Sequence, residues 1–411
     1  MVPSDRTFDV VLWGATGFTG RLVAEYLVRR HGAAAALRWA IGGRSRDKLE
    51  AVRAGLAAID PAAGDLPILV GDSADRASLD GVARATRVVC STVGPFARHG
   101  RELVAACVEA GTDYCDSTGE PQFVRAMIDA HHVRAGQTGA RIVHCCGFDS
   151  VPSDLGTLML QECARAAGHG CVEVRHAVSL HGGAVSGGTA ASMVELMEEA
   201  ARDRGVRRLL ADPFALDPGG EAHDPDGGDP RSIAWDPDLR RWTAPFVMAA
   251  INTRVVRRTN ALLGYAWGRD FRYREAMSFA AGTRGWMRAA SVTGGVAAAM
   301  GVMAVSPLRH LAARVLPASG EGPSKERREK SSFTSRFVGV VRGSSERLHA
   351  TVRGGDPGYD ETAKMLGESA LCLARDRDAT RAGGGVLTPA SCMGMALVDR
   401  LRREGMTFEV E

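Results

Sequence analysis

The sequence FDVVLWGATGFTG, residues 8–20, carries the strongest structural signal in this chain. The run FDVVLW predicts a buried strand, and the residues after Gly20 have the apolar spacing of a helix. Gly14 permits a tight turn between the two, Gly17 lets the backbone approach a ligand, and Gly20 permits close packing of helix against strand. Free amides at the start of a helix bind negative charge. Strand, turn and helix together predict a Rossmann-type site for the pyrophosphate of a dinucleotide.

The spacing G-x-x-G-x-x-G differs by one residue from the commonest fingerprint, G-x-G-x-x-G. A glycine turn with a purely structural role is therefore the alternative. We expect the dinucleotide to contact the residues of the turn, which are Gly14, Thr16, Gly17, Phe18, Thr19 and Gly20.

The same alternation of strand and helix continues to about residue 150. Short β-branched runs predict strands at 8–13, 37–43, 67–71, 87–92, 112–116 and 141–146. Helical periodicity between them predicts helices at 17–31, 46–58, 75–84, 98–110 and 121–137. Strands joined by crossover helices form a doubly wound parallel sheet, so we expect a dinucleotide-binding domain over residues 1–150.

The end of the second predicted strand indicates NADP rather than NAD. NAD enzymes usually carry a carboxylate there for the ribose 2′-hydroxyl, whereas this chain has Arg44, Ser45 and Arg46. A guanidinium can bind a 2′-phosphate with two parallel hydrogen bonds. A solvated pair of arginines in a loop is the alternative. By position alone, we expect Asp72 to reach the adenine and four residues to follow the dinucleotide toward the nicotinamide, namely Ser91, Val93, Gly94 and Pro95.

Composition narrows the class of protein. The 411 residues exceed the usual size of one domain, and 51 basic residues against 48 acidic ones give a net charge of only +3. No basic stripe with interleaved aromatic residues is present, which argues against a nucleic acid partner. The nine cysteines lack metal-ligand or disulfide spacing, and the N-terminus has no room for a signal peptide. We expect a cytoplasmic protein without a metal.

The second half of the chain contains two unusual segments. Residues 289–308 carry no charge and are flanked by arginines, so they could pack as a small-residue helix against the second domain or form a hairpin at a membrane or around an acyl chain. Residues 319–332 are polar and charged, which predicts a flexible linker. A loop is expected over 212–238, after a helix at about 189–210.

Several motifs resemble the saccharopine dehydrogenase-like oxidoreductases, and within them the mycobacterial-type trans-acting enoyl reductases. The likeness covers nearly the whole chain. It rests on GATGFTG at Gly14, GGRS at Gly42, VGPF at Val93, YCDSTGE at Tyr114, GFDSVPSDLG at Gly147, SGGT at Ser186, FRYRE at Phe271 and GGVLTP at Gly384.

The resemblance implies a Rossmann domain, a second α/β (α+β) domain with a mixed sheet over residues 151–380, and a C-terminal segment, 381–411, that returns to the first domain. For the enoyl reductases it also implies NADPH-dependent reduction of a double bond in a polyketide-derived lipid precursor, carried by a synthase without its own reductase domain. True saccharopine enzymes hold several substrate carboxylates, and we can assign no matching cationic cluster here.

Enoyl reduction needs a group that meets the negative charge developing on the thioester oxygen. Candidates lie where the sixth strand meets the second domain, because ligands bind at the carboxyl ends of parallel strands. They are His144, Asp149, Ser150, Ser186 and Thr189. Each has a structural alternative: Asp149 or Ser150 could cap the next helix, and a lone histidine in an apolar strand is usually a core residue. The proton donor is not identified.

Three functions remain open at this point. The first is reduction of a polyketide- or fatty-acyl-type thioester in lipid biosynthesis, in the cytoplasm or at the inner face of the membrane through 289–308. The second is reduction of an imine or carbonyl in a small metabolite. The third is a non-catalytic NADP-binding protein associated with lipid.

Overall fold

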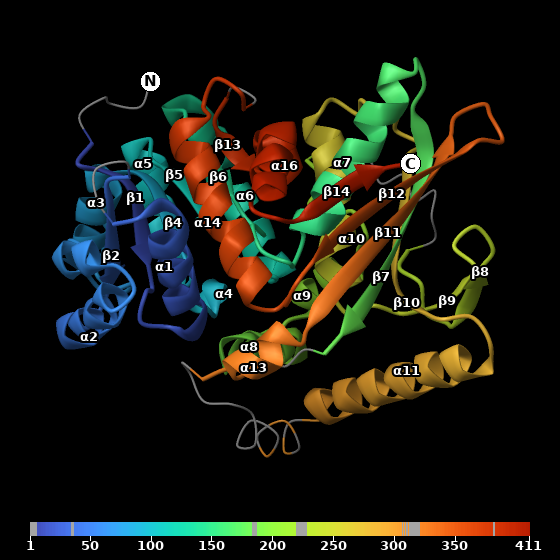
Figure 1. Cartoon of the computed structure of the whole chain (residues 1–411), viewed down its shortest axis with the longest axis horizontal. Coiled ribbons are helices and arrows are strands. Elements are labelled where there is room, and N and C mark those ends of the chain that lie inside the picture. Colours follow the sequence, from blue (N-terminus) through green and yellow to red (C-terminus); the bar gives the residue numbers. More distant parts are fainter. Residues whose placement is uncertain are drawn as a thin grey trace.

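The computed structural model contains two β-sheets that lie side by side, with helices packed against each (Figure 1). It describes residues 6–33, 37–182, 187–218, 228–305, 307, 309, 311, 321–380 and 383–411.

Sheet A is parallel and has the strand order β13-β6-β5-β4-β1-β2-β3. β1 lies in its middle, where Val10 pairs with Trp39 of β2 on one side and with Val88 of β4 on the other. The doubly wound sheet is therefore confirmed. Its strands are β1 (Phe8–Trp13), β2 (Trp39–Gly43), β3 (Ile68–Val70), β4 (Thr86–Ser91), β5 (Asp113–Asp116), β6 (Arg141–Val143) and β13 (Gly385–Leu387).

Helices cover both faces of sheet A, as the alternating pattern predicted. They are α1 (Phe18–His31), α2 (Arg46–Ala57), α3 (Arg76–Ala85), α4 (Phe96–His99), α5 (Arg101–Ala110) and α6 (Pro121–Thr138), with a short 3₁₀ helix, η1, at Pro61–Asp65. The helix expected at 98–110 is divided and begins earlier, because the buried Glu120 accepts hydrogen bonds from the backbone amides of Phe96 and Ala97 and so caps α4.

Sheet B is mixed, which confirms the expectation for the second domain. Its order is β14-β12-β11-β7-β10-β9-β8; β7 and β10 are parallel and the other neighbours are antiparallel. Helices α7 (Val151–Ala166) and α10 (Ala249–Leu262) pack against it. The strands are β7 (Cys171–His181), β8 (Ala234–Asp236), β9 (Arg241–Ala244), β10 (Arg272–Phe279), β11 (Ser332–Val341), β12 (Arg347–Gly354) and β14 (Thr407–Val410).

The C-terminal part of the chain joins both sheets. Its return begins before residue 381, because α14 (Asp360–Arg375) already packs against α1, β1, β4 and β5. β13 then extends sheet A beside β6, and β14 extends sheet B beside β12. Between these strands lie α15 (Pro389–Cys392) and α16 (Gly394–Arg403).

A buried ion pair holds this return in place. Arg141 of β6 pairs with Asp113 of β5, and both side chains are almost fully buried. The same guanidinium donates to the carbonyl of Leu373 at 2.6 Å and to the hydroxyl of Thr380 at 2.8 Å. One guanidinium thus ties sheet A to α14 and to the turn that follows it.

One prediction for the second half of the chain is wrong. The segment 319–332 is not wholly a flexible linker, because residues 325–329 form helix α13 (Lys325–Glu329), which Ser324 caps, and β11 begins at Ser332; residues 319 and 320 lie outside the described part.

Of the two alternatives for residues 289–308, the structure has the helix. Residues 289–304 belong to α11 (Thr283–Ala304), which contacts β9, β10 and α8 of the second domain but is largely exposed; residues 306 and 308 lie outside the described part.

The helix expected at 189–210 is two helices. α8 (Gly187–Arg202) ends before Asp203, whose carboxylate accepts from the amide of Gly205 and so caps α9 (Arg204–Ala211). The predicted loop at 212–238 ends with β8, and its residues 219–227 lie outside the described part.

Candidate active site

The glycine turn after β1 has the geometry that a pyrophosphate site requires. Gly14 has a φ of +93°, a conformation that side chains strain, and a Cβ there would lie 2.6 Å from Cγ2 of Val93. A Cβ on Gly20 would lie 2.2 Å from the carbonyl oxygen of Gly14, so helix α1 packs directly on the turn. Gly17 differs, because a Cβ there would lie 3.4 Å from the carbonyl oxygen of Gly14, which is close to ordinary van der Waals contact. The turn therefore leaves its face open at Gly17.

The end of β4 lies against this turn. The Thr92 hydroxyl is 3.2 Å from the carbonyl oxygen of Trp13 and 3.1 Å from that of Gly14, and it can donate to either. Ser91 is buried, and its hydroxyl accepts from the amide of Val93 at 3.5 Å. Gly94 and Pro95 follow and lead into α4. The predicted residues 91–95 thus lie beside the glycine turn at the carboxyl edge of sheet A.

One residue of the predicted turn has another role for its side chain. The Phe18 ring contacts Tyr359 edge to face, with ring centroids 5.1 Å apart. A Cβ on Gly322 would also clash with this ring, at 2.5 Å. The Phe18 ring therefore anchors the C-terminal return. Only the backbone amide of Phe18, at the start of α1, remains a candidate for binding the cofactor.

The basic residues after β2 lie at the entrance to this edge. Arg44 is exposed and has no carboxylate within ion-pair distance among the described residues. Ser45 instead caps α2 by accepting from the amide of Lys48 at 3.4 Å, and Arg46 has only a distant ion pair with Glu50 at 3.9 Å. Asp72 is exposed, and its carboxylate accepts from the amide of Ala74. Of this group, Arg44 has the free guanidinium that a 2′-phosphate requires.

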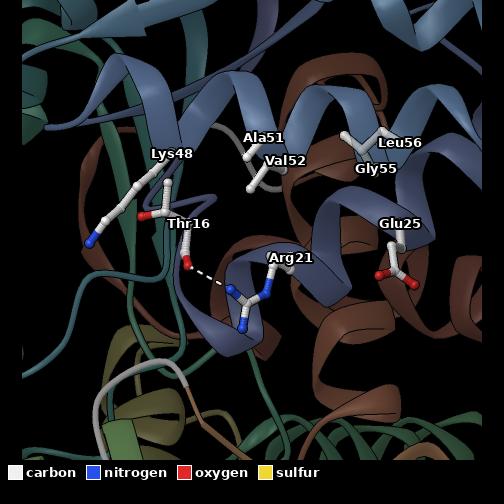
Figure 2. Close-up of a pocket in the computed structure, with 8 residues that line it drawn as sticks. All are labelled: Thr16, Arg21, Glu25, Lys48, Ala51, Val52, Gly55 and Leu56. Carbon is white, nitrogen blue, oxygen red and sulfur yellow. Dashed lines mark hydrogen bonds between the residues drawn. The ribbon is translucent and has the colours of Figure 1, made fainter.

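A groove of about 370 Å³ runs between α1 and α2 next to these residues. Figure 2 shows Thr16 and Lys48 close together at one end of it, with Arg21 donating to the carbonyl of Thr16 at 3.2 Å. Lys48 adds a cation beside the glycine turn that the sequence did not single out.

His144 is a core residue rather than a catalytic one. Its ring lies among Tyr114 and Phe123 and is 2% exposed, while Nδ1 lies 2.8 Å from the carboxylate of Asp116. Asp116 also accepts from the amide of Cys145. The structural alternative therefore holds for His144, which keeps the ends of β5 and β6 together.

Ser150 points inward as well. It is fully buried and donates to the side-chain oxygen of Asn252 at 3.0 Å, and Asn252 donates in turn to Glu275 at 2.7 Å. Ser150 occupies the N-cap position of α7 without a side-chain cap hydrogen bond. Thr189 is exposed in the first turn of α8, and Ser186 lies outside the described residues.

Asp149 is half-buried in the turn between β6 and α7, at the carboxyl edge of sheet A. Its two carboxylate oxygens lie 3.1 Å and 3.2 Å from the positions that Cβ atoms on Gly119 and Gly147 would take, so both glycines make room for it. Burial raises its pKa to about 7, and the negative charges of Asp116 and Glu120 act in the same direction. At neutral pH the Asp149 carboxyl group is therefore protonated in about half of the molecules.

An apolar wall adjoins Asp149. The terminal methyl carbon of Met248 lies 3.7 Å from the same Cβ position on Gly119, so Met248 and the Asp149 carboxylate both lie close to this glycine. Behind Met248 is a small cluster built on Val178 and Phe246, against which half-buried apolar side chains pack. These are Phe148, Leu180, Met248 and Met277. The acid thus stands beside a surface suited to a hydrocarbon chain.

Comparison with known proteins places these features in a family. Residues 10–143 match the saccharopine dehydrogenase NADP-binding domain. A Mycobacterium tuberculosis protein named as a trans-acting enoyl reductase is 44% identical over 421 residues, covering 100% of this chain and 99% of its own. The trans-acting enoyl reductase of Mycobacterium bovis is 42% identical over 423 residues, covering 99% of each chain. The chain belongs to the trans-acting enoyl reductase family.

This family membership makes the protein an NADP-dependent oxidoreductase. Among solved structures, saccharopine dehydrogenase (L-Glu forming) from Saccharomyces cerevisiae shares the fold, with a TM-score of 0.50, 13% identity, and coverage of 98% of this chain and 99% of that one.

The site of this enoyl reductase homologue fits NADP. Gly14 and Gly20 shape a cradle that a Cβ would fill, Gly17 leaves it open, and Arg44 has a guanidinium free for phosphate. Among the residues that the structure describes, no group of three or more histidine, cysteine, aspartate or glutamate side chains could hold a metal ion.

Sequence reasoning missed several residues of the site. Glu120 follows β5 at the carboxyl edge of sheet A and lies in the YCDSTGE motif, so its position was a usable signal. Ser192 of α8, which donates to Glu120 at 2.7 Å, and Met248 gave no local signal, because they reach the site only through the packing of the second domain.

Proposed function

We propose that this protein uses NADPH to reduce the carbon–carbon double bond of an α,β-unsaturated polyketide- or fatty-acyl-type thioester. Membership of the enoyl reductase family supports the reaction class. The observation that carries the proposal is a proton-bearing carboxyl group, Asp149, beside an apolar wall at the carboxyl edge of the dinucleotide-binding sheet.

In this scheme the chain holds both partners and supplies the proton. The glycine turn and Arg44 would hold the pyrophosphate and the 2′-phosphate of NADPH, which when bound provides the hydride for the β-carbon. The thioester then carries an enolate charge. Asp149 delivers its proton to the α-carbon and completes the saturated product, while the apolar wall that includes Met248 binds the acyl chain and excludes water.

We further propose that the substrate is presented by a partner. Trans-acting enoyl reductases are named for action on another protein's intermediate. A polyketide synthase without a reductase domain is the partner that this chemistry calls for, and cytoplasmic lipid biosynthesis is the setting. The half-buried apolar side chains beside Asp149 support an acyl rather than a highly charged substrate.

The test is NADPH consumption by the purified protein with three substrates that differ only in the reacting bond. We expect turnover of an enoyl thioester and none of the matched β-ketoacyl thioester or of a small imine. Turnover of the imine alone would contradict the proposal and support a saccharopine-like reaction.

A second measurement tests the proton donor. The rate should fall as the pH rises through about 7, where Asp149 loses its proton, and Asp149→Asn should lower kcat about a hundredfold or more at pH 6 without changing NADPH affinity. An unchanged rate in this variant would remove Asp149 from the mechanism.

A further inference from the structure

Helix α11 exposes an unusually large apolar surface. It is 22 residues long, and only 11% of its most apolar 18-residue window is buried. The exposed large apolar side chains of the described residues are concentrated here, since more than half of them belong to α11 or the residues just after it. These are Trp286, Met287, Met300, Val302, Val305 and Leu311, which are 38–59% exposed. Such a patch marks an interaction surface.

Along the chain, the charge of this segment is of one sign, and the acidic Glu198 of α8 lies beside Arg309, beyond the end of the helix. From residue 276 to residue 320 the sequence contains no aspartate or glutamate but has arginines at 284, 288, 309 and 314. Arg284 and Arg288 are exposed in the first two turns of α11, next to Trp286 and Met287. Arginine with exposed tryptophan and methionine at one end of an apolar helix is the composition that suits an anionic lipid surface.

Both ends of α11 are attached to the rest of the protein. At its start, Gly285 and Ala289 are buried, and Trp242 of β9 donates to the carbonyl of Gly282 at 3.2 Å. At its end, Met303 is buried, and Arg309, just beyond the helix, lies 3.9 Å from the carboxylate of Glu198 of α8. Among the described residues α11 is the one helix long and apolar enough to cross a membrane, but spanning would break these contacts at both ends.

Helix α11 lies next to α8 (Figure 1). Ser192 of α8 donates to Glu120, which also accepts from the amide of Phe96. A surface that covered α11 would therefore lie near α8, which contacts Glu120 at the carboxyl edge of sheet A.

From these observations we infer that α11 lies flat on an anionic lipid bilayer, with Trp286 and Met287 in the headgroup region and Arg284 and Arg288 against lipid phosphates. Binding of α11 to lipid would not depend on which reaction the protein catalyses, because it follows from the exposure, charge and attachment of this helix. The exposed arginines beside Trp286 suit an anionic lipid surface better than a second copy of the chain.

The test is flotation of the full-length protein with vesicles. Vesicles of equal parts phosphatidylglycerol and phosphatidylcholine should carry the protein, and vesicles of phosphatidylcholine alone should carry much less. Replacing Arg284 and Arg288 by glutamine should lower partitioning onto the anionic vesicles roughly thirtyfold, about fivefold for each arginine. Trp286→Ser with Met287→Ser should lower binding to both kinds of vesicle.

Matched controls lie on helices α3 and α6, which do not pack against α11. Val133 is 74% exposed on α6, and Arg84 and Arg134 are exposed on α3 and α6. The variants Val133→Ser and Arg84→Gln with Arg134→Gln should float like the unchanged protein, and NADPH binding should be normal in every variant. Equal loss in the control variants, or no flotation together with an α11-dependent dimer in sedimentation velocity, would overturn the inference. Neither result bears on whether the protein reduces an enoyl thioester.

Discussion

Replacing Asp149 by asparagine should stabilise the protein at alkaline pH. The carboxyl group is held between Gly119 and Gly147 and accepts no hydrogen bond from the side chain or backbone of another described residue. Asparagine has the same shape without the charge, so it keeps the packing and removes the cost of a desolvated carboxylate. A site arranged for proton transfer is therefore expected to be less stable than its inactive variant.

The size of this stabilisation follows from the difference between the pKa of Asp149 in the folded protein and its pKa in the unfolded chain. The pKa of Asp149 is about 7 in the folded state, against 3.8 for an aspartate exposed to water in an unfolded chain. A raised pKa in the folded state means that stability is highest below pH 3.8 and is lost as the pH rises toward 7. At 1.36 kcal/mol per pKa unit the full loss is about 4 kcal/mol, of which about 3 kcal/mol falls between pH 5 and pH 8.

Urea unfolding at pH 5 and pH 8 measures this effect directly. The advantage of Asp149→Asn over the unchanged protein should grow by about 2–3 kcal/mol from the lower to the higher pH. Comparing the two pH values cancels any constant effect of the new amide. An advantage that does not change with pH would refute the reasoning, because Asp149 would then titrate equally in the folded and unfolded states.

Asp154 is the matched control for this experiment. Burial also raises its pKa to about 7, but its carboxylate accepts from the hydroxyl of Thr259 at 2.5 Å and from the amide of Ala390 at 2.8 Å. Asp154→Asn should show the same dependence on pH and a loss of about 1–3 kcal/mol at pH 5, since one buried donor loses its partner. Activity per folded molecule should remain.

Three further predictions concern the cofactor site and the core. Arg44→Ala should weaken NADPH binding about tenfold to a hundredfold in a fluorescence titration and leave NADH binding unchanged; equal loss for both would contradict the 2′-phosphate assignment. Gly20→Ala should lower the melting temperature by several degrees because its Cβ would lie 2.2 Å from a carbonyl oxygen, whereas Gly17→Ala should melt normally yet bind NADPH more weakly. Arg141→Ala should cost about 3–5 kcal/mol in urea unfolding, because buried Asp113 would keep only its longer ion pair with the exposed Arg377, and a loss below about 1 kcal/mol would show that the Arg141 ion pair does not hold the return.

Local patterns predicted sheet A well because each of its strands and helices is formed by neighbouring residues. The apolar run before Gly14 and the glycine spacing after it specify a strand, a tight turn and a helix regardless of what packs around them. The order of the sheet follows from right-handed crossovers, which leave few alternatives. Strand β13 escaped prediction because it is short and pairs with β6 across more than 200 residues of sequence.

The role of each candidate in the site depended on distant partners. His144, Asp149 and Ser150 lie within seven residues of one another, yet His144 is in the core, Asp149 lies against Gly119 and Gly147, and Ser150 donates to Asn252 of α10. Their sequence neighbours do not distinguish these roles, because desolvation and hydrogen bonding are set by the side chains that the second domain brings against them.

By itself the sequence determined the Rossmann domain, the preference for NADP and the family, since strand, turn and helix signals are local and the motifs run through the chain. Only the tertiary structure decided which carboxyl groups have a pKa raised to about 7, those of Asp149 and Asp154, and whether the uncharged segment after Arg288 is buried. Composition cannot settle either point, because burial is a property of the surfaces that meet when both sheets pack, and α11 packs along only one side.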